Sequence, residues 1–228
     1  MSEKPIIFSP PMVKAILEGE KTVTRRIIKV PPCEIHEHGS TVSVTRPLKF
    51  KNEDARFCPY EPYHVGDILW VREKWKGIYH DAGLNLFIAQ FFDGSKKEFS
   101  IDNDRFDRVC MLASKCGKKG WQPSIFMPRE AARIFLEIKS ISVGRLQEIG
   151  LNDVLAEGIR HHELENIPKR SDRPDLSDDE FKGVENWILS YARYEFEKLW
   201  DGINSKRGYP WRSNPWVWVI EFRRIDKK

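Results

Sequence analysis

The chain has 228 residues, of which 40% are hydrophobic and 32% are charged, with a formal net charge of +4. This composition is typical of a folded globular protein and excludes a small scaffold that depends on disulfides. The length suits one core domain with insertions better than two full domains. The small positive charge permits a polyanionic partner without requiring one, and the eight tryptophans fit stacking on nucleobases as well as a large core.

No apolar run is long enough to cross a membrane, and the N-terminus lacks the basic and apolar regions of a signal peptide. We therefore expect a cytoplasmic protein with no membrane partner and with free thiols at its four cysteines. The sequence indicates no particular oligomeric state.

The first elements predicted along the chain are a short strand at Ile6–Phe8 and a helix. Ser9 can cap this helix, with proline tolerated in its first turn. Its apolar residues share one face: Met12, Val13, Ile16 and Leu17. Gly19 suits the left-handed position that ends such a helix, and a strand from about Thr22 to Ile28 follows.

A run of Lys, Thr and Arg from Lys21 to Arg26 begins that strand. Such a run can bind phosphate or a polarised carbonyl, or it can supply a base to a hydroxyl nucleophile; otherwise it is a solvated edge strand. Strict alternation along a strand puts Lys21 and Thr24 on opposite faces. The two side chains therefore meet only if the strand starts at or after Lys21, or is bulged there.

The middle of the chain alternates irregular stretches with short strands. Residues from about Cys33 to Pro62 are polar and rich in proline, which predicts an irregular surface insertion. A turn at Val65–Asp67 leads into a buried strand at Ile68–Val71. A second strand covers Leu86–Phe92 and is followed by a loop at 93–97, whereas residues 102–120 give no assignment.

The C-terminal half is predicted to contain a strand at Ala132–Ile141 and a short helix at Leu151–Glu157 that stops at Gly158. Ser177 and Glu180 form a capping box that opens a long helix to about Trp200. Residues on or near one face of that helix are Val184, Trp187, Ile188, Tyr191 and Leu199. In the last strand, Trp216–Phe222, large apolar residues alternate.

Many short strands with helices at their connections predict an α+β fold built on a small mixed or antiparallel barrel rather than on βαβ units. We expect the barrel to contain the strands that start near Thr22, Ile68, Leu86, Ala132 and Trp216. The helix from Met12 would pack at one end of it.

This ordered pattern resembles the ASCH family of the PUA-like superfamily of small β-barrels. The matching segments are Ile16–Arg26, Val65–Glu73, Leu146–Ile149 with Ala156–Gly158, and Trp216–Phe222. The resemblance implies a single PUA-like domain over residues 1–228, with flanking helices and loop insertions near 33–62, 93–120 and 160–180. Those insertions are similar to the longer branch found in bacteriophages and prophages, which implies a bacterial or phage-infected host cell.

The resemblance also implies a function. Barrels of the superfamily commonly bind RNA, and compact ASCH members include an amidohydrolase that removes the acetyl group of acetylated cytidine with a Lys, a Thr and a Glu. By motif these correspond to Lys21, Thr24 and, if the segment at Leu146–Ile149 is aligned without gaps, Glu157. Thr24 would be the nucleophile, a neutral Lys21 its base, and Glu157 the group that orients water or moves a proton.

Other residues have both a functional and a structural interpretation. Arg25 and Arg26 would lower the pKa of Lys21, and Arg26 can hold a carbonyl oxygen or a phosphate. Arg72 and Glu73 read a base edge or form a structural ion pair, and Trp75, like Trp121, stacks on bases or belongs to the core.

Three functions fit these residues: an amidohydrolase acting on acetylated cytidine or a related base, a non-catalytic module that binds RNA or a modified nucleoside, and a ribonuclease. We expect no cofactor and no metal, because the cysteines and histidines match no zinc pattern: Cys33, His36, His38, Cys58 and His64, with Cys110 and Cys116.

Overall fold

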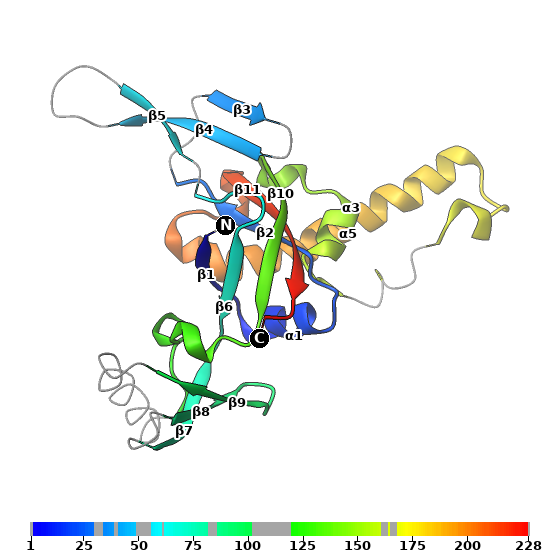
Figure 1. Cartoon of the computed structure of the whole chain (residues 1–228). Coiled ribbons are helices and arrows are strands. Elements are labelled where there is room, and N and C mark those ends of the chain that lie inside the picture. The colour runs from blue at the N-terminus through cyan, green and yellow to red at the C-terminus, as the bar shows by residue number, and fades with distance from the viewer. Residues whose placement is uncertain are drawn as a thin grey trace. The chain divides into compact units, whose positions relative to one another are not determined.

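The structure is a computed structural model of a mixed α+β chain (Figure 1), in which the strands described form three sheets. The residues described are 2–29, 34–38, 41–48, 56–60, 62–81, 86–101, 120–160, 164 and 168–227.

The largest sheet has five strands in the order β1-β6-β10-β11-β2. Their bounds are Glu3–Ile7 (β1), Ile68–Arg72 (β6), Phe135–Arg145 (β10), Trp216–Ile225 (β11) and Val23–Ile27 (β2). β1 pairs with β6 in parallel, whereas β10 runs antiparallel to β6 and β11 runs antiparallel to β2. Leu69, Trp70 and Val71 are buried in succession, as expected for a strand covered on both faces.

A three-stranded antiparallel sheet occupies the region predicted to be an irregular insertion, so that prediction is wrong. Its strands are β3 (Glu34–His38), β4 (Thr41–Leu48) and β5 (Arg56–Tyr60). The prolines do not prevent pairing, because Pro59 lies on the edge strand β5 and Pro47 lies beyond the last residue of β4 that pairs with β3.

A second small sheet contains β7 (Trp75–Asp81), β8 (Leu86–Phe91) and β9 (Lys96–Ser100) in that order. The predicted strand from Leu86 is therefore real, but its expected place beside the other four strands is wrong. Its alternating burial, with Phe87, Ala89 and Phe91 inside, indicates a strand without indicating which sheet it joins.

The helices follow their local sequence signals. α1 (Pro10–Leu17) carries proline in its first turn, and Gly19 follows at a φ of 78°. α3 covers Leu151–Ala156. Short 3-10 helices cover Ser124–Phe126, Arg129–Ala131, Leu146–Glu148, Arg170–Asp172, Ser205–Arg207 and Trp211–Ser213.

The long helix α5 runs over Asp178–Asn204, and its capping box is confirmed because the Ser177 side chain accepts a hydrogen bond from the Glu180 amide. Of the residues predicted to lie on or near one face of α5, Trp187 is 55% exposed and stacks on Tyr191. The buried residues of α5 are Phe181, Ile188, Ala192, Phe196, Trp200 and Asn204. No helix in the described part of the chain is both long and apolar enough to cross a membrane.

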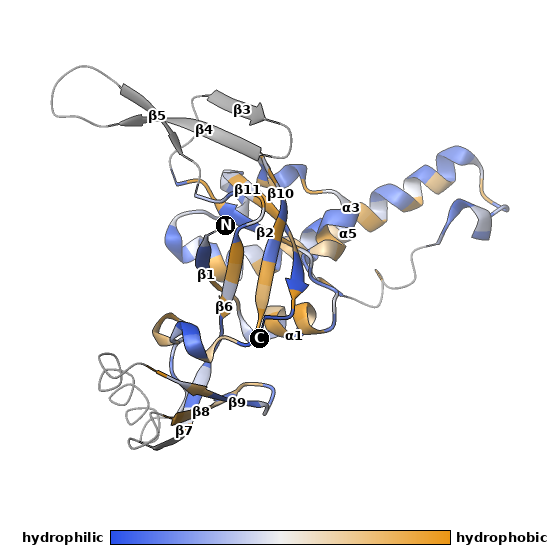
Figure 2. Cartoon of the chain, in the orientation of Figure 1, coloured by the Kyte–Doolittle hydropathy of each residue, from blue (hydrophilic) through white to orange (hydrophobic). Residues whose placement is uncertain are grey.

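Two compact units divide the chain. The first comprises Met1–Gly19, Gly66–Ile138 and Phe222–Lys228, and its core contains Trp70, Trp75 and aromatic residues of β8 and β9. The second comprises Glu20–Val65 and Lys139–Glu221, and its core joins α3 and α5 to β11. Figure 2 shows apolar residues along much of β6 and α1, as expected for buried elements.

Candidate functional site

The candidate site of the second unit forms where the segment before β2 meets the end of α3. Lys21 and Glu157 form an isolated antiparallel bridge, and the Thr22 amide donates to the Ala156 carbonyl at 2.8 Å. Gly19 ends α1 just before Lys21, and Gly158 follows Glu157 at the end of α3; both glycines have a positive φ. Two helix ends thereby bring together residues that are 136 positions apart.

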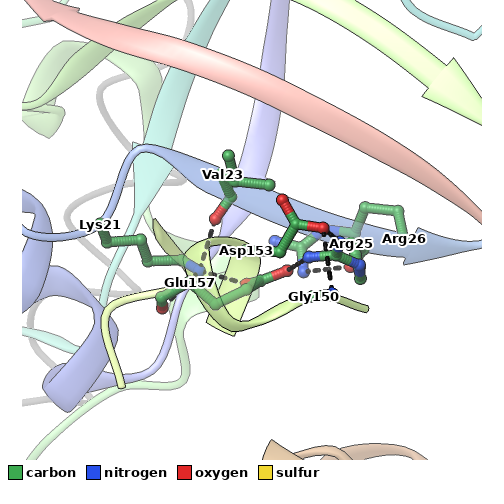
Figure 3. A network of polar contacts seen from close by, with 7 residues as sticks. All are labelled: Lys21, Val23, Arg25, Arg26, Gly150, Asp153 and Glu157. Atoms are coloured by element: carbon green, nitrogen blue, oxygen red, sulfur yellow. Dashed lines mark hydrogen bonds and ion pairs between the residues drawn. The ribbon is translucent and has the colours of Figure 1, made fainter. Parts of the chain in front are cut away.

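The Lys21 ammonium is the centre of this site (Figure 3). Its Nζ donates to Glu157 Oε2 at 2.5 Å, to the Glu157 carbonyl at 2.9 Å and to the Val23 carbonyl at 2.8 Å. The lysine side chain has no exposed surface and that of Glu157 is 4% exposed. A lysine ammonium carries three hydrogens, so each has an acceptor in this arrangement.

Arg25 supplies a second cation to the same carboxylate. Its Nη1 donates to Glu157 Oε1 at 3.2 Å, and its Nη2 donates to Asp153 Oδ2 at 2.8 Å. The guanidinium also lies 5.9 Å from the ring centre of Phe196 in α5, within the range of a cation–π contact. The buried charges of Lys21, Arg25 and Glu157 are thus joined by the half-exposed carboxylate of Asp153, which gives two cations and two carboxylates in one network.

Burial is the largest influence on the pKa values of Lys21, at the centre of this network, and of Arg26 beside it. It lowers the pKa of Lys21, and the nearby charges of Arg26 and Arg25 act in the same direction, whereas Glu157 opposes the shift. Burial also lowers the pKa of Arg26, with Tyr63 and Glu157 opposing it and Arg207 acting with it. Arg26 as a whole residue is half-buried, and its Nη1 donates to the Arg25 carbonyl at 3.4 Å.

Thr24 lies on β2, on the face opposite Arg25. β2 begins at Val23, so Lys21 lies before the strand, and its ammonium reaches the Val23 carbonyl. Alternation then places Val23 and Arg25 on one face and Thr24 and Arg26 on the other. Thr24 is 1% exposed, and the contacts found among the described residues include no hydrogen bond from its hydroxyl to Lys21.

The structure thus joins Lys21 and Glu157, two of the three residues expected to be catalytic, and adds Asp153, which the sequence analysis did not select. Its signal was present, because Asp153 and Glu157 are four residues apart and so share a face of α3. Arg25, expected to bind substrate, is instead the shared counterion of these two carboxylates.

The residues predicted around β6 belong to the first unit. Both oxygens of the buried Glu73 carboxylate accept hydrogen bonds from Arg133 at 2.8 Å, so Glu73 takes part in a structural ion pair. Burial raises the pKa of Glu73, and Arg133 opposes the shift. Trp75 has no exposed surface, which leaves no ring face for a base, whereas Trp121 is partly exposed beside Phe92.

The described residues contain no group of three or more His, Cys, Asp and Glu side chains placed to hold a metal ion. Cys33, Cys110 and Cys116 lie outside the described residues.

Comparison with known proteins gives no identification: the chain matches no model of a protein family, no curated protein and no solved structure.

Proposed function

We propose that the chain is an ASCH-type, PUA-like domain that hydrolyses an N-acyl amide on a base of RNA or of a modified nucleoside, with acetylated cytidine as the model substrate. The observation that carries this proposal is the buried contact between Lys21 and Glu157. The motif resemblance assigns both residues to one catalytic site, and they lie in direct contact across 136 positions of sequence. The five-stranded sheet with an alternating last strand is compatible with a PUA-like barrel.

The chemistry of the pair suits amide hydrolysis. A surface lysine is almost wholly protonated near neutral pH, but burial lowers the pKa of Lys21. A larger fraction of Lys21 than of a surface lysine is therefore neutral and able to act as a base. Glu157, in hydrogen-bond contact with this amine, is placed to carry a proton between it and the leaving group.

In the proposed reaction the start of β2 rearranges, so that the Thr24 hydroxyl reaches the Lys21 amine from the other face of the strand, replaces the Val23 carbonyl as its partner and gives up its proton to the amine. Thr24 Oγ1 bonds to the acyl carbon and the C–N bond breaks. The exocyclic amine of the nucleobase then leaves with a proton carried by Glu157. Water then cleaves the acyl–threonine ester, releasing the carboxylic acid and restoring Thr24. Arg26, partly exposed on the same strand face as Thr24, can donate to the acyl oxygen.

A non-catalytic module that binds RNA is the second candidate, and a specific observation favours it. All three hydrogens of the Lys21 ammonium already have acceptors, so the network is complete without a substrate. In that case Lys21, Glu157 and Arg25 hold β2 in place, and Arg26 presents the positive charge.

The test is incubation of the protein with acetylated cytidine, other N-acylated nucleosides and short RNAs, followed by mass analysis. Thr24→Ser keeps a hydroxyl and should keep turnover, whereas Thr24→Ala should lose at least about a hundredfold. Thermal unfolding of both variants controls for the fold.

Turnover by Thr24→Ala at the wild-type rate would remove the proposed nucleophile. RNA binding without turnover of any acylated nucleoside would favour the binding module, and shortened RNA would indicate a ribonuclease.

A further inference from the structure

The segment from Arg72 to Lys76, where β6 ends and β7 begins, carries three cations and one carboxylate. The carboxylate, Glu73, is 2% exposed, and both of its oxygens are occupied by Arg133, which comes from another part of the first unit. The acid beside Arg72 in sequence therefore does not neutralise Arg72. Among the described residues, no carboxylate forms an ion pair with Arg72, Lys74 or Lys76.

Arg72 is the member of this group whose surroundings are most unusual. Among the described residues its guanidinium makes no hydrogen bond and no ion pair, and its Nε atom is buried without a partner. The contact that it does make is with the ring of Trp70, whose centre lies 4.6 Å from its Cζ. Burial lowers the pKa of Arg72, and no neighbouring carboxylate opposes the shift.

Such an arrangement costs free energy that a ligand can recover. Buried side-chain donors almost always have acceptors, and a buried donor without one destabilises the fold. The cation–π contact with the Trp70 ring offsets part of this cost. The N–H groups of the guanidinium have no acceptor among the described residues, and a guanidinium can bind two oxygens of one anion.

Two further observations point the same way. Lys74 and Lys76 are partly buried and form no ion pair within the described part of the chain, so they add attraction for an anion. The indole N–H of Trp75 is buried in the same core cluster as Trp70 and also lacks an acceptor there. The segment is therefore rich in donors and poor in acceptors.

We propose that this segment is an oxyanion-binding site, in which Arg72, in contact with the Trp70 ring, binds two oxygens of the phosphate or carboxylate group of a ligand. Phosphate and carboxylate share the acceptor geometry that a guanidinium recognises. The site belongs to the first unit and does not depend on the amidohydrolase proposal, because its test measures binding and not turnover.

The test compares thermal unfolding of the wild-type chain, Arg72→Met and Arg133→Met in inorganic phosphate, in acetate and in chloride at matched ionic strength. We expect phosphate or acetate to raise the wild-type Tm saturably, because a ligand that binds the folded state stabilises it. Without these anions Arg72→Met should unfold at the wild-type Tm or above it, since it removes an unpaired cation, and it should show no saturable rise. Arg133→Met is the matched control: it should lower the Tm but keep the rise.

A rise with phosphate alone would identify a phosphate group, one with acetate alone a carboxylate, and one with both a general oxyanion site. An equal saturable rise in Arg72→Met, or no saturable rise in the wild type with either anion, would overturn the proposal. If Arg133→Met does not fold, Arg72→Lys replaces it in the comparison: it keeps the charge without the planar fork, so saturation should require at least about tenfold more anion than in the wild type.

Discussion

The Lys21 ammonium and the Glu157 carboxylate lie 2.5 Å apart, although 136 residues separate them in sequence and both side chains are buried. Glu157 also accepts from Arg25 on its other oxygen, so one carboxylate compensates two cations. A buried charge that loses its partner is far more costly than the intact pair is stabilising. The contact therefore fixes the start of β2 to the end of α3, whether or not it also performs catalysis.

The first prediction concerns the energy of this contact. Glu157→Leu should lower the free energy of unfolding by about 3–5 kcal/mol, because the buried Lys21 ammonium loses its carboxylate. Lys21→Met should lower it by less, because Glu157 keeps its contact with Arg25. The double variant should lose clearly less than the sum of the two, because it removes both charges. Urea unfolding of the four proteins measures the difference.

Lys14→Met is the control for this cycle. The Lys14–Glu18 pair is an exposed i,i+4 contact at 3.7 Å, and its loss should change stability by less than about 1 kcal/mol. Simple additivity of the Lys21 and Glu157 losses would show that the two side chains do not compensate each other.

The second prediction is a pH dependence. Burial lowers the pKa of Lys21 from 10.5, so between its folded pKa and 10.5 the unfolded chain binds more protons at this residue than the folded chain does. The contribution of Lys21 to stability is therefore full above pH 10.5 and is lost as the pH falls through the folded pKa. The difference in unfolding free energy between the wild type and Lys21→Met should rise with pH in that window, and a fall would contradict the lowered pKa.

Local sequence signals predicted several of the individual elements but missed β3, β4, β5, β7 and β9. Gly19 marks the end of α1, the capping box at Ser177 marks the start of α5, and the alternation after Trp216 marks β11. The pairing of strands was less predictable. β8 has the same alternating pattern as a strand of the large sheet, and its partners β7 and β9 depend on tertiary packing that period-2 alternation does not encode.

The candidate site was predictable where a motif resemblance carried it and not elsewhere. The resemblance placed Lys21 and Glu157 together, and the structure brings them into contact. Arg25 binds both Asp153 and Glu157 because α3 lies against β2. That position is set by long-range packing, which the sequence pattern does not show. From residue type alone, Arg25 and Arg26 were equally good candidates for binding substrate.

The third prediction concerns Glu73 and Arg133. In Arg133→Met the buried Glu73 carboxylate loses both of its hydrogen-bond donors, so its pKa, already raised by burial, should rise further. The folded chain then keeps a proton that the unfolded chain loses near pH 4.5, and stability should fall as the pH rises from 4.5 towards the folded pKa.

Near neutral pH we expect Arg133→Met to lose about 3–5 kcal/mol in urea unfolding, with a smaller loss at acidic pH. Adding Glu73→Gln to this variant removes the titrating group and should flatten the pH profile. A profile that is unchanged by the second substitution would assign the pH dependence to another residue.

The last prediction compares Arg26 and Arg207 with Arg25, which is committed to two carboxylates. Arg26 is half-buried, and Arg207, whose charge acts on Arg26, is exposed and forms no ion pair within the described part of the chain. If the protein binds RNA through this region, Arg26→Gln and Arg207→Gln should each reduce the number of phosphate contacts by about one. That reduction is measured as a shallower slope of log K against log salt, by about 0.7 for single-stranded RNA. Arg25→Gln is the matched control: its guanidinium already binds Asp153 and Glu157, so it should lower stability and leave the slope unchanged. An equal loss of slope in Arg25→Gln would mean that the buried network opens when RNA binds.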